Sequence, residues 1–483
     1  AVNLIDYYLK KYNDGPMDAI GRAIVRIRGS YALAVMFRDY PGEIYFARKD
    51  SPLIIGKGEG EMFLASDVPA ILQYTKQVYY IGNQEVGCIS AEGAQFFNLD
   101  RKEIPHELIT VEMDASAAEK GGFEHFMIKE IHEQPRALHD TMQSVLDDGG
   151  SVDPAKFGMT PEEIRKVQEI YIVACGSAYH VGVAMQYVLE DIAQVPVRVE
   201  LASEFRYRHL LLKPEDLVIV ISQSGETADS LAALRKAKEC GIKTLGIVNV
   251  IGSSIAREAD SVFYTLAGPE ISVATTKAYS AQLIAGYMIA VSFARCRGAL
   301  DEEGEKAYLA EIAQLPDKMS RILEDKERIQ WFAAKHANAK DVFFIGRGID
   351  YAISMEGSLK LKEISYIHSE AYAAGELKHG TISLIENGTL VVGVLTQQDL
   401  YEKTLSNMVE TGSRGAYLMG LTFYGNYGIE DTANFTVYIP KTDPHFATSL
   451  AVVPLQLLAY YLSVAKGLDV DKPRNLAKSV TVE

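Results

Sequence analysis

The sequence has 483 residues, too many for one hydrophobic core, so we expect two or three domains. Hydrophobic residues make up 48% and charged residues 23% of the chain, which is typical of an ordinary globular protein. The formal net charge of −16 argues against a nucleic-acid partner, although a local positive pocket for a phosphate is compatible with it.

The sequence contains no run of eighteen apolar residues and no signal-peptide pattern at its start, so we expect no membrane segment and a cytoplasmic location. The four cysteines, Cys88, Cys175, Cys240 and Cys296, lack the CxxC or histidine-paired spacing of metal sites. We therefore expect no metal, no cofactor and no disulfide framework.

Residues 1–112 combine two helical patterns with short strands that are separated by turns rich in glycine and aspartate. The helices are expected over 4–12 and around 17–28, and the strands over 30–37, 43–48 and 61–66. This region is predicted to be an antiparallel α+β domain. The stretch 113–125, small and charged in composition, is predicted to be a linker.

From residue 126 onward, apolar strands alternate with amphipathic helices, which indicates an α/β fold with parallel sheets covered on both faces. YIVACG at 171–176 resembles FFIGRG at 343–348, and DLVIVISQSGE at 216–226 resembles TLVVGVLTQQD at 389–399. These separations of 172 and 173 residues indicate a duplicated domain of flavodoxin-like type, with a ligand crevice at the carboxyl ends of its strands. The predicted boundaries are 126–300 for the first copy with its leading helices, 301–334 for a helical connector, 335–468 for the second copy and 469–483 for a tail.

The turn that follows the strand near 218–221 is dense in hydrogen-bond donors. Its donor side chains are those of Ser222, Gln223, Ser224 and Thr227. Gly225 lets the backbone bend, and a helix starting at Glu226 would add unpaired N–H groups and the positive end of its dipole. The turn therefore suits a phosphate monoester, and the alternative is an ordinary helix N-cap.

The second copy carries a charged helical pattern, MEGSLKLKEISYIH, at 355–368. Glu356, Lys360 and Glu363 are spaced to lie on one helix face, so Lys360 can tune the ionisation of Glu363. A carboxylate beside a cation can move a proton between adjacent carbons of a ketose or its imine. The alternative, which the pattern taken alone favours, is an exposed ladder of salt bridges.

Two further residues are candidates for chemistry. His379 lies in a glycine-bracketed loop of small residues after the charged helix, where a mobile acid–base group could reach a sugar ring oxygen. Lys478 lies in the tail and could form a Schiff base with a ketone if it were desolvated. For each of them, an ordinary surface residue is the alternative.

Several motifs resemble those of the glucosamine-6-phosphate synthase family, also called glutamine:fructose-6-phosphate aminotransferase (isomerising). They are EHFMIKEIHEQP (124–135), ASEFRYR (202–208), SQSGETAD (222–229), VATTKA (273–278), KLKEISYIH (360–368), SEAYAAGELKHG (369–380) and DKPRNLAKSVTVE (471–483). The resemblance implies two tandem flavodoxin-like sugar-isomerase (SIS) domains, preceded by part of an α+β N-terminal-nucleophile glutaminase domain. It also implies conversion of D-fructose 6-phosphate and L-glutamine to D-glucosamine 6-phosphate and glutamate, the first step of the hexosamine pathway.

The resemblance also assigns roles to individual residues. It implies that Ser222, Gln223, Ser224 and Thr227 hold the phosphate, and that Cys175, Gly176, Ser177, Val273 and Ala477 contact the sugar. It implies that Lys478 forms an imine at carbon 2, and that Glu363, beside Lys360, moves a proton between carbons 1 and 2. His379 is expected to open the sugar ring from across a dimer interface, so the resemblance implies a homodimer.

The sequence departs from the family pattern in two places. The family usually has two successive hydroxyl residues after ACG, whereas this chain has Ser177 and Ala178, so a phosphate contact is expected to be lost or replaced by water. The family's glutaminase domain begins with a nucleophilic cysteine, whereas this sequence begins with Ala1, and residues 1–112 resemble only the later part of that domain. We therefore expect the chain as given to isomerise fructose 6-phosphate without hydrolysing glutamine, which would act only through a missing N-terminal portion.

Two other functions use similar domains. A non-catalytic sugar-phosphate sensor would need a DNA-binding segment, and the sequence has no basic helix-turn-helix pattern. A deglycase of amino-sugar phosphates would lack the long N-terminal region and the tail.

Overall fold

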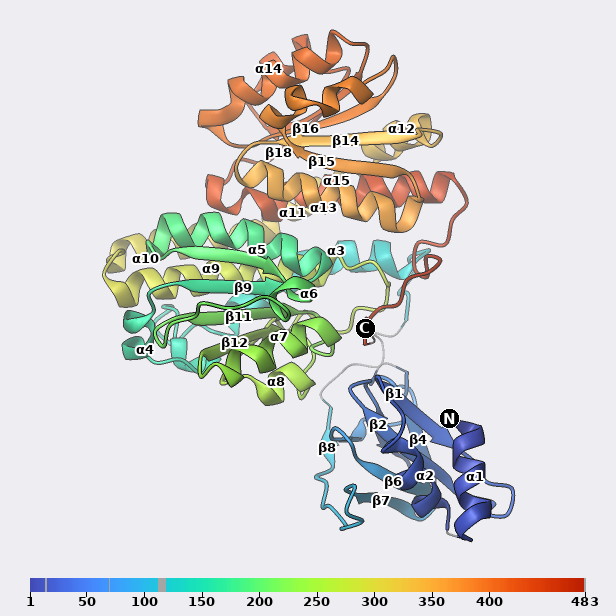
Figure 1. The fold of residues 1–483 in the computed structure, drawn as a ribbon. Coiled ribbons are helices and arrows are strands. Elements are labelled where there is room, and N and C mark those ends of the chain that lie inside the picture. Colours follow the sequence, from blue (N-terminus) through green and yellow to red (C-terminus); the bar gives the residue numbers. More distant parts are fainter. Residues whose placement is uncertain (14, 69, 112–118, 482–483) are drawn as a thin grey trace. The chain divides into compact units, whose positions relative to one another are not determined.

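The computed structural model describes residues 1–13, 15–68, 70–111 and 119–481. The chain divides into two compact units: residues 1–121 with the short pieces 226–229 and 479–483, and residues 122–225 with 230–478 (Figure 1). Residues 112–118, which include much of the predicted linker, lie outside the described residues.

The first unit is an antiparallel α+β structure, as predicted. Its helices are α1 (Val2–Tyr12) and α2 (Pro16–Ile24), so the second helix ends four residues before its predicted end. One sheet has the order β1 (Tyr31–Val35), β2 (Ile44–Lys49), β6 (Val86–Ser90), β7 (Gly93–Phe97), and the other has the order β4 (Met62–Ala65), β3 (Ile54–Lys57), β5 (Gln77–Tyr80), β8 (Ile109–Thr110). Ile20 of α2 packs with Tyr45 of β2 in one core, while Phe46 of β2 and Ile55 of β3 share a second core. The alternation of side chains along β2 therefore supplies both cores.

The second unit begins with a five-stranded parallel sheet. Its order is β10 (Val197–Leu201), β9 (Ile170–Ala174), β11 (Leu217–Ser222), β12 (Lys243–Val248), β13 (Ser261–Tyr264). The helices of this copy are α3 (Phe126–Gln143), α4 (Pro161–Lys166), α5 (Gly176–Val188), α6 (Ala202–Phe205), α7 (Ala228–Glu239), α8 (Ser254–Glu258) and α9 (Lys277–Arg297). The sheet has the flavodoxin-like strand order that the repeat predicted.

The predicted connector forms three helices, α10 (Glu302–Ile312), α11 (Leu315–Glu324) and α12 (Lys326–His336). A second parallel sheet follows, in the order β15 (His368–Ala373), β14 (Asp341–Gly346), β16 (Leu390–Leu395), β17 (Tyr417–Phe423), β18 (Phe435–Ile439). Its helices are α13 (Ile349–Ser365), α14 (Tyr401–Gly412) and α15 (Ala447–Ala465). The two sheets have the same order relative to the chain, so the predicted duplication is confirmed.

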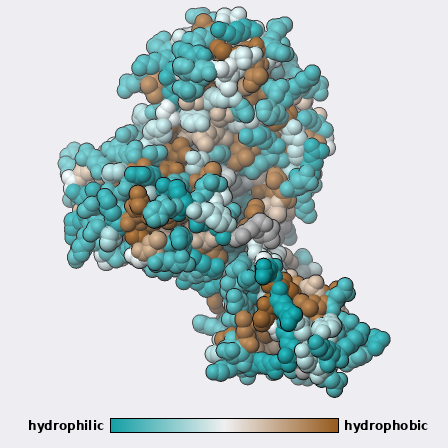
Figure 2. All heavy atoms as spheres, in the orientation of Figure 1, coloured by the Kyte–Doolittle hydropathy of each residue, from teal (hydrophilic) through white to brown (hydrophobic). Residues whose placement is uncertain are grey.

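One hydrophobic core runs through both copies and joins their helices. The copies meet where α5 of the first contacts α13 of the second (Figure 1). The segment Pro444–Ala465, which contains α15, is long and apolar enough to cross a membrane, but 89% of its most apolar window is buried inside the protein. Its composition is therefore that of a core helix, while the face of the molecule drawn in Figure 2 is mostly hydrophilic with scattered hydrophobic patches.

Candidate active site

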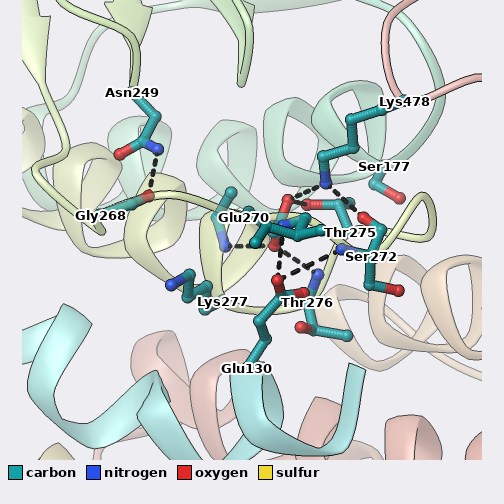
Figure 3. A network of polar contacts seen from close by, with 12 residues as sticks. Glu130, Ser177, Asn249, Gly268, Glu270, Ser272, Thr275, Thr276, Lys277 and Lys478 are labelled. Atoms are coloured by element: carbon teal, nitrogen blue, oxygen red, sulfur yellow. Dashed lines mark hydrogen bonds and ion pairs between the residues drawn. The ribbon is translucent and has the colours of Figure 1, made fainter. Parts of the chain in front are cut away.

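Lys478 lies in the tail with its side chain only 24% exposed. Its Nζ donates a hydrogen bond to the carbonyl oxygen of Ser272 at 2.8 Å and forms an ion pair with the carboxylate of Glu270 (Figure 3). The tail is fastened by Asp471, whose carboxylate accepts hydrogen bonds from the N–H groups of Phe126 and Met127 at 2.9 and 2.8 Å, in the first turn of α3. A tail without regular structure is thus anchored seven residues before its lysine.

Glu270 is the buried counter-charge of Lys478. It precedes α9, and its carboxylate accepts hydrogen bonds from the hydroxyl of Thr275 at 2.7 Å and from the N–H groups of Thr276 at 2.8 Å and Ala278 at 3.1 Å. Burial by itself would raise the pKa of Glu270, but the charge of Lys478 and these hydrogen bonds outweigh it and lower the pKa below its ordinary value. Glu270 is therefore an anion that fixes the nitrogen of Lys478 in place.

Glu356 and Lys360 of α13 are buried and Glu363 is partly buried, so the alternative of an exposed salt-bridge ladder is wrong. The side chains of Glu356 and Lys360 are fully buried, and that of Glu363 is 22% exposed. Lys360 Nζ lies 2.5 Å from Glu363 Oε2 and 3.5 Å from Glu356 Oε1. Burial favours a lower pKa for Lys360, but the charges of Glu363 and Glu356 prevail and raise it, so this lysine is a cation.

The first copy contributes to this charged group through α5. Ser177 donates a hydrogen bond to Glu356 Oε1 at 3.0 Å, and His180 Nδ1 lies 2.8 Å from Glu356 Oε2. Glu270 also contributes to the raised pKa of Lys360, so its charge lies within electrostatic reach of that lysine. The tail, the loop before α9, α5 and α13 thus bring their charged and polar residues into one cluster.

The donor-rich turn after β11 is tightly bent. The N–H of Gly225 donates to Ser222 Oγ at 3.0 Å, and Gly225 has a φ of +65°. A Cβ atom at this position would lie 2.0 Å from Ser253 Oγ, so only glycine fits here without rearrangement. The helix α7 begins at Ala228, two residues later than predicted, because the left-handed glycine ends the turn before the helix can start.

The corresponding turn of the second copy binds one of the protein's own carboxylates. Asp350, fully buried in the first turn of α13, accepts hydrogen bonds from the N–H groups of Thr396 at 2.9 Å and Gln397 at 3.3 Å, and from the Thr396 hydroxyl. At the repeat spacing, Thr396 and Gln397 correspond to Gln223 and Ser224, and Asp350 corresponds to Ala178. The second copy therefore has a carboxyl group against this turn where the first copy has a methyl group.

The other residues predicted to contact the sugar lie at the start of α5, in the loop before α9 and in the tail. Cys175 and Gly176 start α5, where Cys175 Sγ accepts a hydrogen bond from Ser230 at 3.8 Å, and the N–H of Val273 donates to the carbonyl of Asp471 at 3.0 Å. Ala477, directly before Lys478, is exposed.

His379 is exposed at the end of a 3₁₀ helix (Ala374–His379) that follows β15, so it lies in a short helix and not in the predicted loop. The predicted helix 355–368 ends at Ser365, because Tyr366 is left-handed and β15 begins at His368. Within the part of the chain that the structure describes, no hydrogen bond or ion pair joins His379 to Lys478, Lys360 or Glu363.

Sequence reasoning missed Glu270 and His180, which complete the cluster. Glu270 follows Gly268 and Pro269 and lies seven residues before Lys277, the first residue of α9, and an acidic residue shortly before a helix start is a signal for anchoring. His180 offered no such signal, because its partner Glu356 is 176 residues away in the chain.

Comparison with known proteins identifies the domains. The SIS domain family matches residues 163–292 and 336–466. A glutamine–fructose-6-phosphate aminotransferase (isomerizing) of Caldanaerobacter subterraneus subsp. tengcongensis is 53% identical over 481 residues, covering 100% of this chain and 79% of that protein, and one of Clostridium acetobutylicum is 51% identical with the same coverage. The C-terminal domain of glucosamine-fructose-6-phosphate aminotransferase from Francisella tularensis is 38% identical, with a TM-score of 0.70 over 73% of this chain and 100% of that chain. The chain therefore belongs to the family of the isomerizing glutamine–fructose-6-phosphate aminotransferases.

Proposed function

We propose that this chain performs the sugar half of its family's reaction, with Lys478 forming an imine at carbon 2 of D-fructose 6-phosphate and Glu363 moving the proton. One observation carries the proposal: Lys478 and Glu363 belong to one buried charged cluster to which both copies contribute. A surface lysine on a tail would have no buried counter-charge.

The phosphate is assigned to the turn formed by Ser222, Gln223, Ser224 and Thr227. The carboxylate of Asp350 supports this assignment, because it occupies the equivalent turn of the second copy through backbone N–H groups. A phosphate monoester is larger than a carboxyl group and would need the space that the small side chain of Ala178 leaves. Cys175, Gly176, Ser177, Val273 and Ala477 are assigned to the sugar.

The chemistry is balanced without an added oxidant or reductant. The Lys478 amine adds to the C2 carbonyl, and loss of water leaves a carbon–nitrogen double bond. Ammonia then adds to C2 and the Lys478 amine leaves, so that the imine nitrogen now comes from ammonia. Glu363 takes a proton from carbon 1 and returns it to carbon 2, so that C2 becomes an amine-bearing carbon and C1 becomes an aldehyde. Lys360 lies 2.5 Å from Glu363 and places a positive charge beside the carboxylate that accepts the proton. With ammonia as the nitrogen donor, the released product is D-glucosamine 6-phosphate.

The ring-opening step is assigned to His379 of a second copy of the chain, and we propose a homodimer. The exposure of His379, without a bond to the cluster of its own chain, supports a role across an interface. Glutamine would supply ammonia through a glutaminase portion, and we propose a cytoplasmic location for the enzyme.

The test is reductive trapping. The chain is incubated with fructose 6-phosphate and borohydride, and the modified lysine is identified by peptide mass spectrometry. We expect an adduct on Lys478, absent in Lys478→Ala, and an adduct that still forms in Glu363→Gln while isomerisation falls by about a hundredfold or more. An adduct on another lysine, or none, would refute the imine step.

A further inference from the structure

The motif EHFMIKEIHEQP forms the start of α3, and its Glu130 faces the site. Glu130 Oε1 accepts hydrogen bonds from the N–H groups of Ile271 at 2.5 Å and Ser272 at 3.2 Å. The carbonyl of the same Ser272 accepts the hydrogen bond of Lys478, and Glu270 is the residue before Ile271. Figure 3 shows Glu130 pointing from α3 toward this loop.

Glu130 differs from an ordinary structural carboxylate in one respect. It is 2% exposed, and its Oε2 atom is buried without a hydrogen-bond partner among the described residues. A buried oxygen without a hydrogen-bond partner lowers the stability of the folded state by about 1–3 kcal/mol, so a carboxyl group at this position needs an explanation. A structural need for the two N–H contacts alone would be met by one oxygen.

Charges surround Glu130 on several elements. Glu270 and Lys478 face it from the loop and the tail, Lys277 faces it from α9, and its own helix carries Lys129 and Glu133. Burial and the negative charge of Glu270 raise the pKa of Glu130 well above the ordinary value of a carboxyl group, although Lys478 opposes this shift. Two neighbouring carboxyl groups thus divide their roles: Glu270 is the anion, and Glu130 keeps its proton near neutral pH.

The other polar residues of the motif have a different task. Glu133 forms an ion pair with Lys277 at 2.7 Å, and Gln134 bonds Gln456 of α15 at 2.8 Å and Ser280 of α9 at 2.5 Å. Gln134 also donates to the carbonyl of Ile131, which Pro135 leaves without its helical donor. These contacts fasten α3 to α9 and α15 and do not reach the loop of residues 270–272.

We propose that Glu130 is a positioning residue for Lys478: it holds the Ser272 carbonyl against the lysine nitrogen, and as a neutral acid it avoids placing a second negative charge there. The inference rests on the proposed imine at Lys478. A second carboxylate would hold the lysine as an ammonium, which cannot attack a carbonyl. Ionisation of Glu130 at alkaline pH should therefore slow imine formation.

The experiment measures the rate of borohydride-trapped adduct at Lys478 from pH 6 to pH 9.5, with fructose 6-phosphate saturating, in the full chain. Glu130→Gln keeps an oxygen for the two N–H groups and cannot ionise. We expect its rate near pH 7 to stay within about threefold of wild type, and the alkaline inflection seen in the wild type to be absent. Glu130→Ala should lower the rate by about ten- to a hundredfold at every pH, because the loop is no longer held, while binding of the sugar phosphate is little changed.

Glu133→Gln is the matched control, because it lies one turn away on the same helix and removes a buried ion pair without touching the loop. It should reduce thermal stability and leave the pH profile of the wild type intact. Identical pH profiles for wild type and Glu130→Gln would overturn the proposal, even if Glu130→Ala does not fold. Absence of a wild-type adduct at Lys478 would overturn the imine step itself, which separates the two failures.

Discussion

The burial of Asp350 predicts how the free energy of unfolding depends on pH. Burial raises its pKa to about 7, even though Thr396 and Gln397 donate hydrogen bonds to it. In the unfolded chain an aspartate has a pKa of about 3.9. Between these two values the folded state keeps a proton that the unfolded state has released, so the free energy of unfolding must fall as the pH rises.

The size of the effect follows from the shift. Each pKa unit corresponds to about 1.4 kcal/mol, so Asp350 should lower the free energy of unfolding by up to about 4 kcal/mol between pH 4 and pH 7. Asp350→Asn removes the titration and keeps the shape. Its amide group would face a backbone N–H at a cost of about 1–3 kcal/mol, but this cost is the same at every pH. The prediction is therefore that the free energy of unfolding falls with pH in the wild type and does so less in Asp350→Asn.

Trp331 provides the assay. It is the only tryptophan of the sequence, it lies on α12, and its ring centre is 6.3 Å from that of Phe435 on β18, so its fluorescence reports the second copy. Urea unfolding at a series of pH values should show a falling midpoint for the wild type and a flatter one for Asp350→Asn. High salt should leave this difference intact, because Asp350 has no charged partner among its hydrogen bonds. Parallel curves for the two proteins would refute the argument.

Three further predictions concern binding and the tail. Ala178→Asp places a carboxylate where the second copy has Asp350, and calorimetry should show loss of fructose 6-phosphate binding by about a hundredfold or more, while Ala178→Ser retains it. Ser224→Ala should weaken that binding by about 1 kcal/mol with little change in the rate of the bound reaction, and a purely kinetic effect in steady-state assays would contradict its role as a phosphate ligand. Asp471→Ala removes the cap of α3 and should cost about 1–2 kcal/mol and slow trapping at Lys478; unchanged protease sensitivity of the tail would argue against the anchor.

The sequence predicted much of this architecture for identifiable reasons. Strands buried on both faces, such as Leu217–Ser222, are continuous apolar runs, and the recurrence of two such runs at one spacing revealed the duplication. Lys360 and Glu363 were identified because helical spacing is a local property. The burial of Glu356 beside them was not predictable, because its partner Ser177 lies on α5 of the other copy.

The predicted boundaries of helices were wrong where a residue has a left-handed backbone conformation. Gly225 delays the start of α7, and Tyr366 ends α13 before the predicted end. A left-handed conformation can be expected at a glycine but not at a tyrosine, because large residues adopt it only when the surrounding structure imposes it. Tyr366 has such support, since its hydroxyl accepts a hydrogen bond from the N–H of Arg474 at 2.8 Å in the tail.

The two copies share the partners of one buried carboxylate. The charge of Glu356 on α13 is bonded by Ser177 and His180 on α5, and the same carboxylate lies beside Lys360. A buried carboxylate without such partners would cost several kcal/mol, so α13 of the second copy depends on the first copy for the partners of Glu356. The first copy keeps a small residue, Ala178, at its turn, while the second copy fills its turn with Asp350. On the proposed assignment, the turn of the first copy is left for the phosphate of the ligand, while the equivalent turn of the second copy is occupied by the chain's own Asp350.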